Sequence, residues 1–201
     1  MDRPSGTDLE RFERLAAAQR AHRRYLDTPV EPGLLDRIVA IATRAPSAAN
    51  SQPCVFVAIT DATRRAELGH LVETAWRSGG RAWSERHLDG KLLDDVDAGA
   101  TGGIASAPVI LVVCGDADRS PRPALAASVF PAVQNLLLAA TAAGLGSAMT
   151  TLGADDPALR DLLGIGDEVV PMAIIPLGHP AAALGPNRRE PPRVIQDRGP
   201  T

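Results

Sequence analysis

One segment near the middle of the chain, 123–143, is apolar on nearly every side of its expected helix. An isolated helix of this kind would expose apolar side chains to water, because they do not fall on a single stripe. We therefore expect this helix to lie at the centre of the fold, covered by other elements. Gly144 follows it, and glycine favours the left-handed turn that ends a helix.

Composition predicts one domain with an aliphatic core. The chain has 201 residues, so we expect residues 1–201 to form a single unit. Hydrophobic residues make up 45% of the chain and aromatic residues only 3%, so Ala, Val, Leu and Ile must build the core. The net charge of -3 argues against a nucleic-acid surface. Because Lys91 is the only lysine, a single arginine carries little information.

Cysteine usage points to a reducing compartment. Cys54 and Cys114 each lie in or beside an apolar run, where a buried, inert thiol is the usual outcome. We find no disulfide framework, no Cys-x-x-Cys pair and no secretory signal, and no apolar run approaches the roughly 20 residues of a membrane span. We expect a cytoplasmic protein that binds neither nucleic acid nor membranes.

Apolar periodicity along the chain predicts an α+β fold with a helix-covered sheet. We expect helices over 7–19, 30–44, 61–77, 123–143 and 155–163, and strands over 54–60, 108–114, 145–152 and 169–177. The glycine-rich segment 78–106 is expected to be the least ordered part, a mobile lid or insertion over a ligand. The tail 178–201 has no apolar periodicity, and we expect it to lie across the domain or over a partner subunit.

A short uncharged loop, 45–53, gives the first indication of a ligand. Its small side chains let backbone groups approach a flat heterocycle, and Asn50 and Gln52 each offer a hydrogen-bond donor and an acceptor. Arginines occur toward both ends of the chain, at Arg20, Arg23, Arg24, Arg188 and Arg189. Amides for a ring and guanidinium groups for an anion predict a cofactor with a phosphate tail. An ordinary helix-to-strand connection and a solvated helix end are the alternatives.

The usual catalytic machinery is not visible. Ser47 and Ser51 have no evident histidine and acid partners. The histidines are scattered without metal-ligand spacing, at His22, His70, His87 and His179, so we expect no metal site. The glycine pair at 144 and 146 follows a helix, whereas a dinucleotide-binding loop follows a strand. An enzyme of this sequence would therefore need a cofactor for its reactive group.

Four segments resemble, in order, the motifs of the nitroreductase family of flavin mononucleotide (FMN) enzymes. They are 20–25 with 29–30, 44–53, 131–140 with 144–146, and 176–180 with 185–189. The resemblance spans nearly the whole chain. It implies a three-layer sandwich with a central mixed sheet, and a homodimer with FMN sites at the subunit interface. The C-terminal arm would then reach the partner.

The resemblance also implies the residues of the cofactor site. Arg20, Ala21 and Arg23 would line the phosphate and pyrimidine side of the flavin. The other implied contacts are Pro46, Ser47 and Asn50 at the ring or ribityl chain, Arg188 and Arg189 at the phosphate, and Thr150, Thr151 and Leu152 near the reactive ring nitrogen. Gln19, Ala21 and Cys54 depart from the family pattern, which has a basic residue, a serine and a tryptophan there.

The activity implied by the resemblance is a ping-pong oxidoreduction. NADH or NADPH would reduce the flavin, and a nitroaromatic, a quinone or a similar electron-poor acceptor would then take the electrons. No side chain is assigned as acid or base, and Arg23 is expected to tune the flavin electrostatically. The alternatives are a flavin carrier or sensor without turnover, a relative that oxidises a specific metabolite or fragments the flavin, and a colourless domain.

Overall fold

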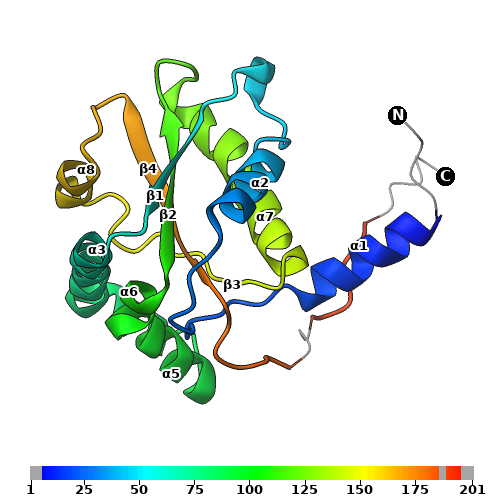
Figure 1. Cartoon of the computed structure of the whole chain (residues 1–201), viewed down its shortest axis with the longest axis horizontal. Coiled ribbons are helices and arrows are strands. Elements are labelled where there is room, and N and C mark those ends of the chain that lie inside the picture. The colour runs from blue at the N-terminus through cyan, green and yellow to red at the C-terminus, as the bar shows by residue number, and fades with distance from the viewer. Residues whose placement is uncertain (1–5, 186–188, 196–201) are drawn as a thin grey trace.

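A four-stranded sheet between two layers of helices forms the body of the protein in a computed structural model, which describes residues 6–185 and 189–195 (Figure 1). The strand order is β1 (Cys54–Ile59), β2 (Val109–Asp116), β4 (Val169–Gly178), β3 (Gly146–Ser147). Every ladder among the described strands is antiparallel. The expectation of a mixed sheet was therefore wrong, because the one parallel pairing within residues 6–185 and 189–195 is an isolated bridge between Ala21 and Ser147.

Strand β2 shows why helices cover both faces of the sheet. Its side chains alternate between the two faces, and all but the last residue are buried. Val109, Leu111 and Val113 join one apolar cluster, while Ile110 and Val112 join the other. A strand that is buried on both faces requires a helix layer on each side. The α+β sandwich of three layers is thus confirmed.

Helices α2 (Pro32–Ala42) and α7 (Arg122–Ala142) cover one face. Ten residues of α7 are buried, as its all-round apolar sequence predicts, and Gly144 follows it with a φ of 73°. By length and composition α7 could cross a membrane, so the expectation that no segment approaches that length was wrong. Its side chains instead pack against the sheet, which makes it a core helix.

Helices α3 (Ala62–Ala75) and α8 (Pro157–Leu163) pack on the other face. Asp61 and Asp156 cap them, each accepting a hydrogen bond from a backbone N–H in the first turn, so the expected starting points are confirmed. Helix α1 (Gly6–Ala18) is different, since none of its residues is buried. It extends away from the body of the domain (Figure 1).

Segment 78–106 is helical over most of its length, where the sequence predicted the least ordered part of the chain and a mobile lid or insertion. It contains the π-helical turn η2 (Trp76–Gly80), α4 (Arg81–Glu85), α5 (Gly90–Ala98), a second π-helical turn η3 (Gly99–Gly103) and α6 (Ile104–Ser106). The glycines that indicated disorder lie mainly in the two π turns. Each turn is kinked by non-helical backbone angles, at Gly79 in η2 and at Thr101 and Gly102 in η3. Turns of this kind are frequent at functional sites.

Segment 145–152 was expected to form one strand, and this was only partly right. Strand β3 contains two residues, after which the chain leaves the sheet and Met149 is exposed. Thr150 returns to β4 through a single bridge, in which its N–H lies 3.0 Å from the oxygen of Ile174. The short strand leaves residues 148–152 free to line a cavity.

Candidate functional site

The segment from Ala21 to Leu26 runs along the sheet edge between β3 and the end of β4. The His22 N–H donates to Ser147 O at 2.9 Å, and the Leu26 N–H donates to His179 O at 2.9 Å. The Tyr25 hydroxyl donates to the backbone oxygen of His22 and lies 3.3 Å from Pro176 O. The first sequence motif is therefore fixed in place by backbone hydrogen bonds.

Turn η3 packs closely around Arg23. A Cβ on Gly99 would lie 2.7 Å from Arg23 Cδ, and a Cβ on Gly103 would lie 2.3 Å from the backbone oxygen of Arg23. Only glycine permits this approach. Burial lowers the pKa of the Arg23 guanidinium, and nearby Asp95 opposes that shift, so the side chain keeps its charge at neutral pH.

A small cavity brings Arg23, Thr150 and Leu152 together, three of the residues that the sequence predicted. The remaining lining residues are Val96, Gly99, Ala100, Ile104, Ala148, Met149 and Pro176. The sequence placed segment 78–106 over a ligand but singled out none of the lining residues from α5, η3 and α6, because the only signal there was a group of glycines that indicated disorder. The cavity has one cationic wall and otherwise largely apolar ones.

The backbone of residues 150–152 was expected to direct N–H groups toward a ligand. The Thr150 N–H bonds to Ile174 O, and the Leu152 N–H donates to Thr150 Oγ1 at 3.1 Å. Within the described part of the chain, the Thr151 N–H has no hydrogen-bond partner. Thr151 does not itself line the cavity, but it carries this backbone donor between two residues that do.

A second cavity adjoins the first through Arg23. It is lined by Ala21, His22, Arg23, Arg24, Asp95, Ala182 and Leu184. Burial, followed by the charge of Arg20, lowers the pKa of His22. Arg20 itself donates from Nη1 to Gly185 O at 2.8 Å, so it holds the start of the C-terminal arm. Arg189 is exposed, and Arg188 lies outside the described residues.

Loop 45–53 does not line the Arg23 cavity. It borders a separate cavity with Cys54 and Arg119, and its Ala48 N–H donates to Ser128 Oγ on α7 at 3.1 Å. Three non-glycine residues of the loop, Ala49, Asn50 and Gln52, have φ values of 51°, 53° and 48°. Residues rarely adopt this region of φ unless the surroundings enforce it, and such residues cluster at functional sites.

Loop 45–53 contains three of the predicted site residues, Pro46, Ser47 and Asn50. Within a single chain these residues do not line the cavity that contains Arg23. Ser47 Oγ accepts from the Gln52 N–H at 2.9 Å and stabilises the loop. The Gln52 amide donates to Asn50 Oδ1 at 3.2 Å, which leaves the remaining polar atoms of both exposed amides available to a ligand.

The three-layer sandwich thus combines a cationic cavity with a separate loop whose backbone is strained and whose amides are exposed. The Nitroreductase family profile matches residues 16–179, and the chain belongs to this family. It is therefore an oxidoreductase of the NAD(P)H nitroreductase and NADH dehydrogenase type.

Individual relatives support this assignment. A Thermus thermophilus protein named NADH dehydrogenase is 34% identical over 196 residues, which cover 88% of this chain and 90% of that protein. A Methanothermobacter thermautotrophicus protein, named as an NADH dehydrogenase/NAD(P)H nitroreductase, is 30% identical over 171 residues, with 83% and 76% covered. The structure of iodotyrosine deiodinase bound to FMN and 3-iodo-L-tyrosine matches with a TM-score of 0.70 at 25% identity, covering 94% of this chain and 98% of that one.

Proposed function

We propose that this protein binds FMN and uses NADH or NADPH to reduce an electron-poor acceptor such as a nitroaromatic or a quinone. The observation that carries the proposal is the half-buried guanidinium of Arg23 in a cavity with Thr150 and Leu152. The same fold holds FMN in iodotyrosine deiodinase.

The residues present fit the ring of a flavin. Its pyrimidine edge is rich in hydrogen-bond acceptors, and the cavity offers the Arg23 cation as a donor. We propose that the N–H of Thr151, which lies in the chain between the lining residues Thr150 and Leu152, is a second donor. The walls from Val96, Ala100 and Ile104 are apolar, as a flat ring requires.

The fit to the flavin phosphate is less complete. Ala21 has no hydroxyl to donate, and one guanidinium nitrogen of Arg20 is bonded to Gly185 O. His22 is neutral at pH 7, because its pKa is lowered from an ordinary value of 6.5. Arg24 lines the second cavity together with His22. We propose that Arg24 contributes to phosphate binding, beside Arg20 and the C-terminal arginines Arg188 and Arg189.

We propose that the complete site needs two chains. The Arg23 cavity has a volume of about 70 Å³, whereas ligand pockets measure roughly 300–1,000 Å³. Leu9 and Phe12 of α1 are exposed, as is Ile195 at the end of the described arm, with 82% of its surface accessible. A homodimer would cover these apolar residues and bring the partner's loop 45–53 over the cavity.

When bound, FMN would supply the electron transfer between the nicotinamide and the acceptor, for which the site offers no side chain. The chain's own contribution is orientation and charge. The positive charge of Arg23 favours electron uptake nearby, and the Thr151 N–H orients the ring. We propose that α4 and α5 cover the site.

We also propose a cytoplasmic location, because the thiols of Cys54 and Cys114 are both free.

The test is an absorbance titration of the purified protein with FMN, followed by NADPH without oxygen and then by a quinone. We expect one FMN per chain, loss of the yellow colour within seconds of adding NADPH, and its return with the acceptor. Absence of stoichiometric uptake would refute the proposal. A yellow protein that NADPH does not bleach would instead be a carrier or sensor. Product analysis under air would identify oxidation of a specific metabolite or fragmentation of the flavin.

A further inference from the structure

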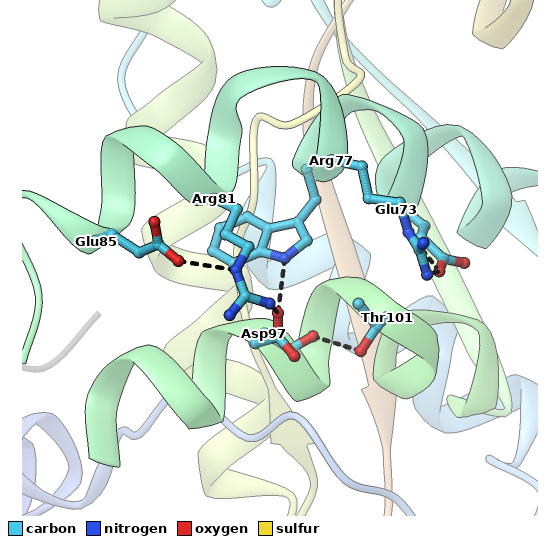
Figure 2. A network of polar contacts seen from close by, with 7 residues as sticks. Glu73, Arg77, Arg81, Glu85, Asp97 and Thr101 are labelled. Carbon is cyan, nitrogen blue, oxygen red and sulfur yellow. Dashed lines mark hydrogen bonds and ion pairs between the residues drawn. The ribbon is translucent and has the colours of Figure 1, made fainter. Parts of the chain in front are cut away.

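A polar network centred on Asp97 joins the two π-helical turns of the segment that covers the cavity (Figure 2). Asp97 Oδ1 accepts from Trp76 Nε1 at 2.9 Å and from Arg81 Nη1 at 2.9 Å. The Thr101 hydroxyl donates to the backbone oxygen of Asp97 at 2.8 Å. The carboxylate of Asp97 therefore connects η2 and α4 to α5, and its backbone oxygen connects α5 to η3.

The hydrogen bond between Asp97 and Trp76 is the one in this network whose loss would leave a buried donor without a partner. The Trp76 side chain is buried, with 1% of its surface exposed, so its N–H cannot turn to water if the carboxylate is lost. The neighbouring ion pairs Arg81–Glu85 and Arg77–Glu73 lie at the surface and stabilise little. Arg81 balances the charge of the half-buried carboxylate.

Of the two turns, η3 lines the Arg23 cavity through Gly99 and Ala100, whereas η2 lies behind the cavity wall and packs on the lining residue Leu152. In η2, a Cβ on Gly80 would lie 2.9 Å from Leu152 Cδ2 and 3.2 Å from the Trp76 ring, so Leu152 packs directly on this turn. In η3, Gly99 packs against the Arg23 side chain. Asp97 itself does not line the cavity, and any influence on a ligand must pass through Arg23 and Leu152.

We infer that Asp97 is a positioning residue for the FMN site, because its bonds to Trp76 and Arg81 hold η3 against Arg23 and η2 against Leu152. This role rests on the proposed function. Asp97 would thereby fix the position of the Arg23 charge relative to the flavin ring. That position affects both the affinity of the protein for FMN and the reduction potential of the bound flavin.

Three variants separate this role from a general effect of surface charge. Asp97→Ala removes both side-chain bonds, whereas Asp97→Asn keeps an oxygen that can accept from the Trp76 N–H. Glu85→Gln is the matched control, because it removes the other carboxylate partner of Arg81 and leaves Trp76 untouched. We would measure the FMN dissociation constant, the midpoint potential of the bound flavin, and amide hydrogen exchange of the flavin-free protein.

We expect Asp97→Ala to weaken FMN binding by about tenfold and to shift the potential, because the unpaired Trp76 N–H would favour conformations in which η3 no longer packs against Arg23. Asp97→Asn should recover most of the affinity, and Glu85→Gln should match the wild type. In the flavin-free protein, Asp97→Ala should accelerate amide exchange across residues 99–104 more than Glu85→Gln does.

Wild-type FMN affinity and potential in Asp97→Ala would overturn the inference, as would equal losses in Asp97→Ala and Glu85→Gln. Failure of the wild type to bind FMN would refute the proposed function instead. In that case the exchange data decide the positioning role alone, since equal exchange across residues 99–104 in the two variants would overturn it.

Discussion

Gly99 lies directly against the side chain of Arg23, so close that a Cβ at position 99 would fall 2.7 Å from Arg23 Cδ. The backbone of Gly99 has a φ of -64°, which any residue adopts. The contact, and not backbone freedom, therefore accounts for glycine at this position. This contact also brings the glycine-rich turn η3 against Arg23, the cationic residue that the sequence predicted for the site.

Gly99→Ala should destabilise the protein by about 1–3 kcal/mol, because the added methyl group must displace Arg23 or the turn. FMN affinity should fall as well. Urea unfolding and an FMN titration measure the two effects. Gly33→Ala in α2 is the control, since nothing lies within 4 Å of a Cβ there, and it should stabilise by about 0.5–1 kcal/mol. A Gly99→Ala protein as stable and as FMN-avid as the wild type would contradict the packing argument.

Arg23→Ala should weaken FMN binding by roughly 10- to 150-fold, because a hydrogen bond from a charged group is worth about 1.5–3 kcal/mol. The flavin that remains bound should have a lower midpoint potential, since a cation near the ring favours electron uptake. Spectroelectrochemical titration of FMN-loaded protein provides the measurement. Arg37→Ala, at an exposed position on α2, should change neither quantity. An unchanged potential in the loaded Arg23 variant would remove the tuning role.

His22 should make the protein less stable as the pH falls below about 6.5. Burial and Arg20 lower the pKa of His22 in the folded protein, so the unfolded chain takes up the proton first. Stability is therefore fully present above the unfolded pKa and is lost as the pH falls through it toward the folded value. His22→Gln should reduce the slope of stability against pH between 7.5 and 5.5 in urea unfolding experiments. A steeper slope in that variant would show that the shift has the opposite sign.

The two thiols should differ in reactivity although neither is activated. Burial raises the pKa of Cys114 to about 12 and also raises the pKa of the half-buried Cys54. At pH 8 a disulfide reagent should modify Cys54 slowly and Cys114 only after unfolding, because the thiolate is the reactive form. Cys54→Ser should abolish the slow native phase, and Cys114→Ser should leave it intact. A fast reaction of Cys114 in the folded protein would contradict this assignment.

Local sequence patterns predicted most of the elements. Helix α7 and strand β2 are so apolar that only a buried position suits them, and Asp61 and Asp156 mark helix starts by the chemistry of their side chains. The resemblance implied a common site for Arg23, Thr150 and Leu152, and the three residues line one cavity in the structure. Such signals are readable because they depend on neighbours within one or two turns of the chain.

Other features depend on contacts between segments that are distant in sequence. The glycines of 99–103 look like breaks in a helix, yet they allow a π turn to enclose Arg23 from a segment about 75 residues earlier. Arg20 was expected at a phosphate, and its bond to Gly185 O depends on where the arm returns. The two-residue length of β3 likewise follows from its pairing with β4.

The sequence by itself determined most of the helices and strands and an aliphatic core, and it predicted a cofactor site from a cation and an amide loop. Only the tertiary structure decided that the ladders are antiparallel, that residues 76–106 are helical, and that Arg23 and loop 45–53 line separate cavities in one chain. The reason is physical: burial periodicity is written along the chain, whereas the close approach of Gly99 to Arg23 exists only once the two segments have packed together.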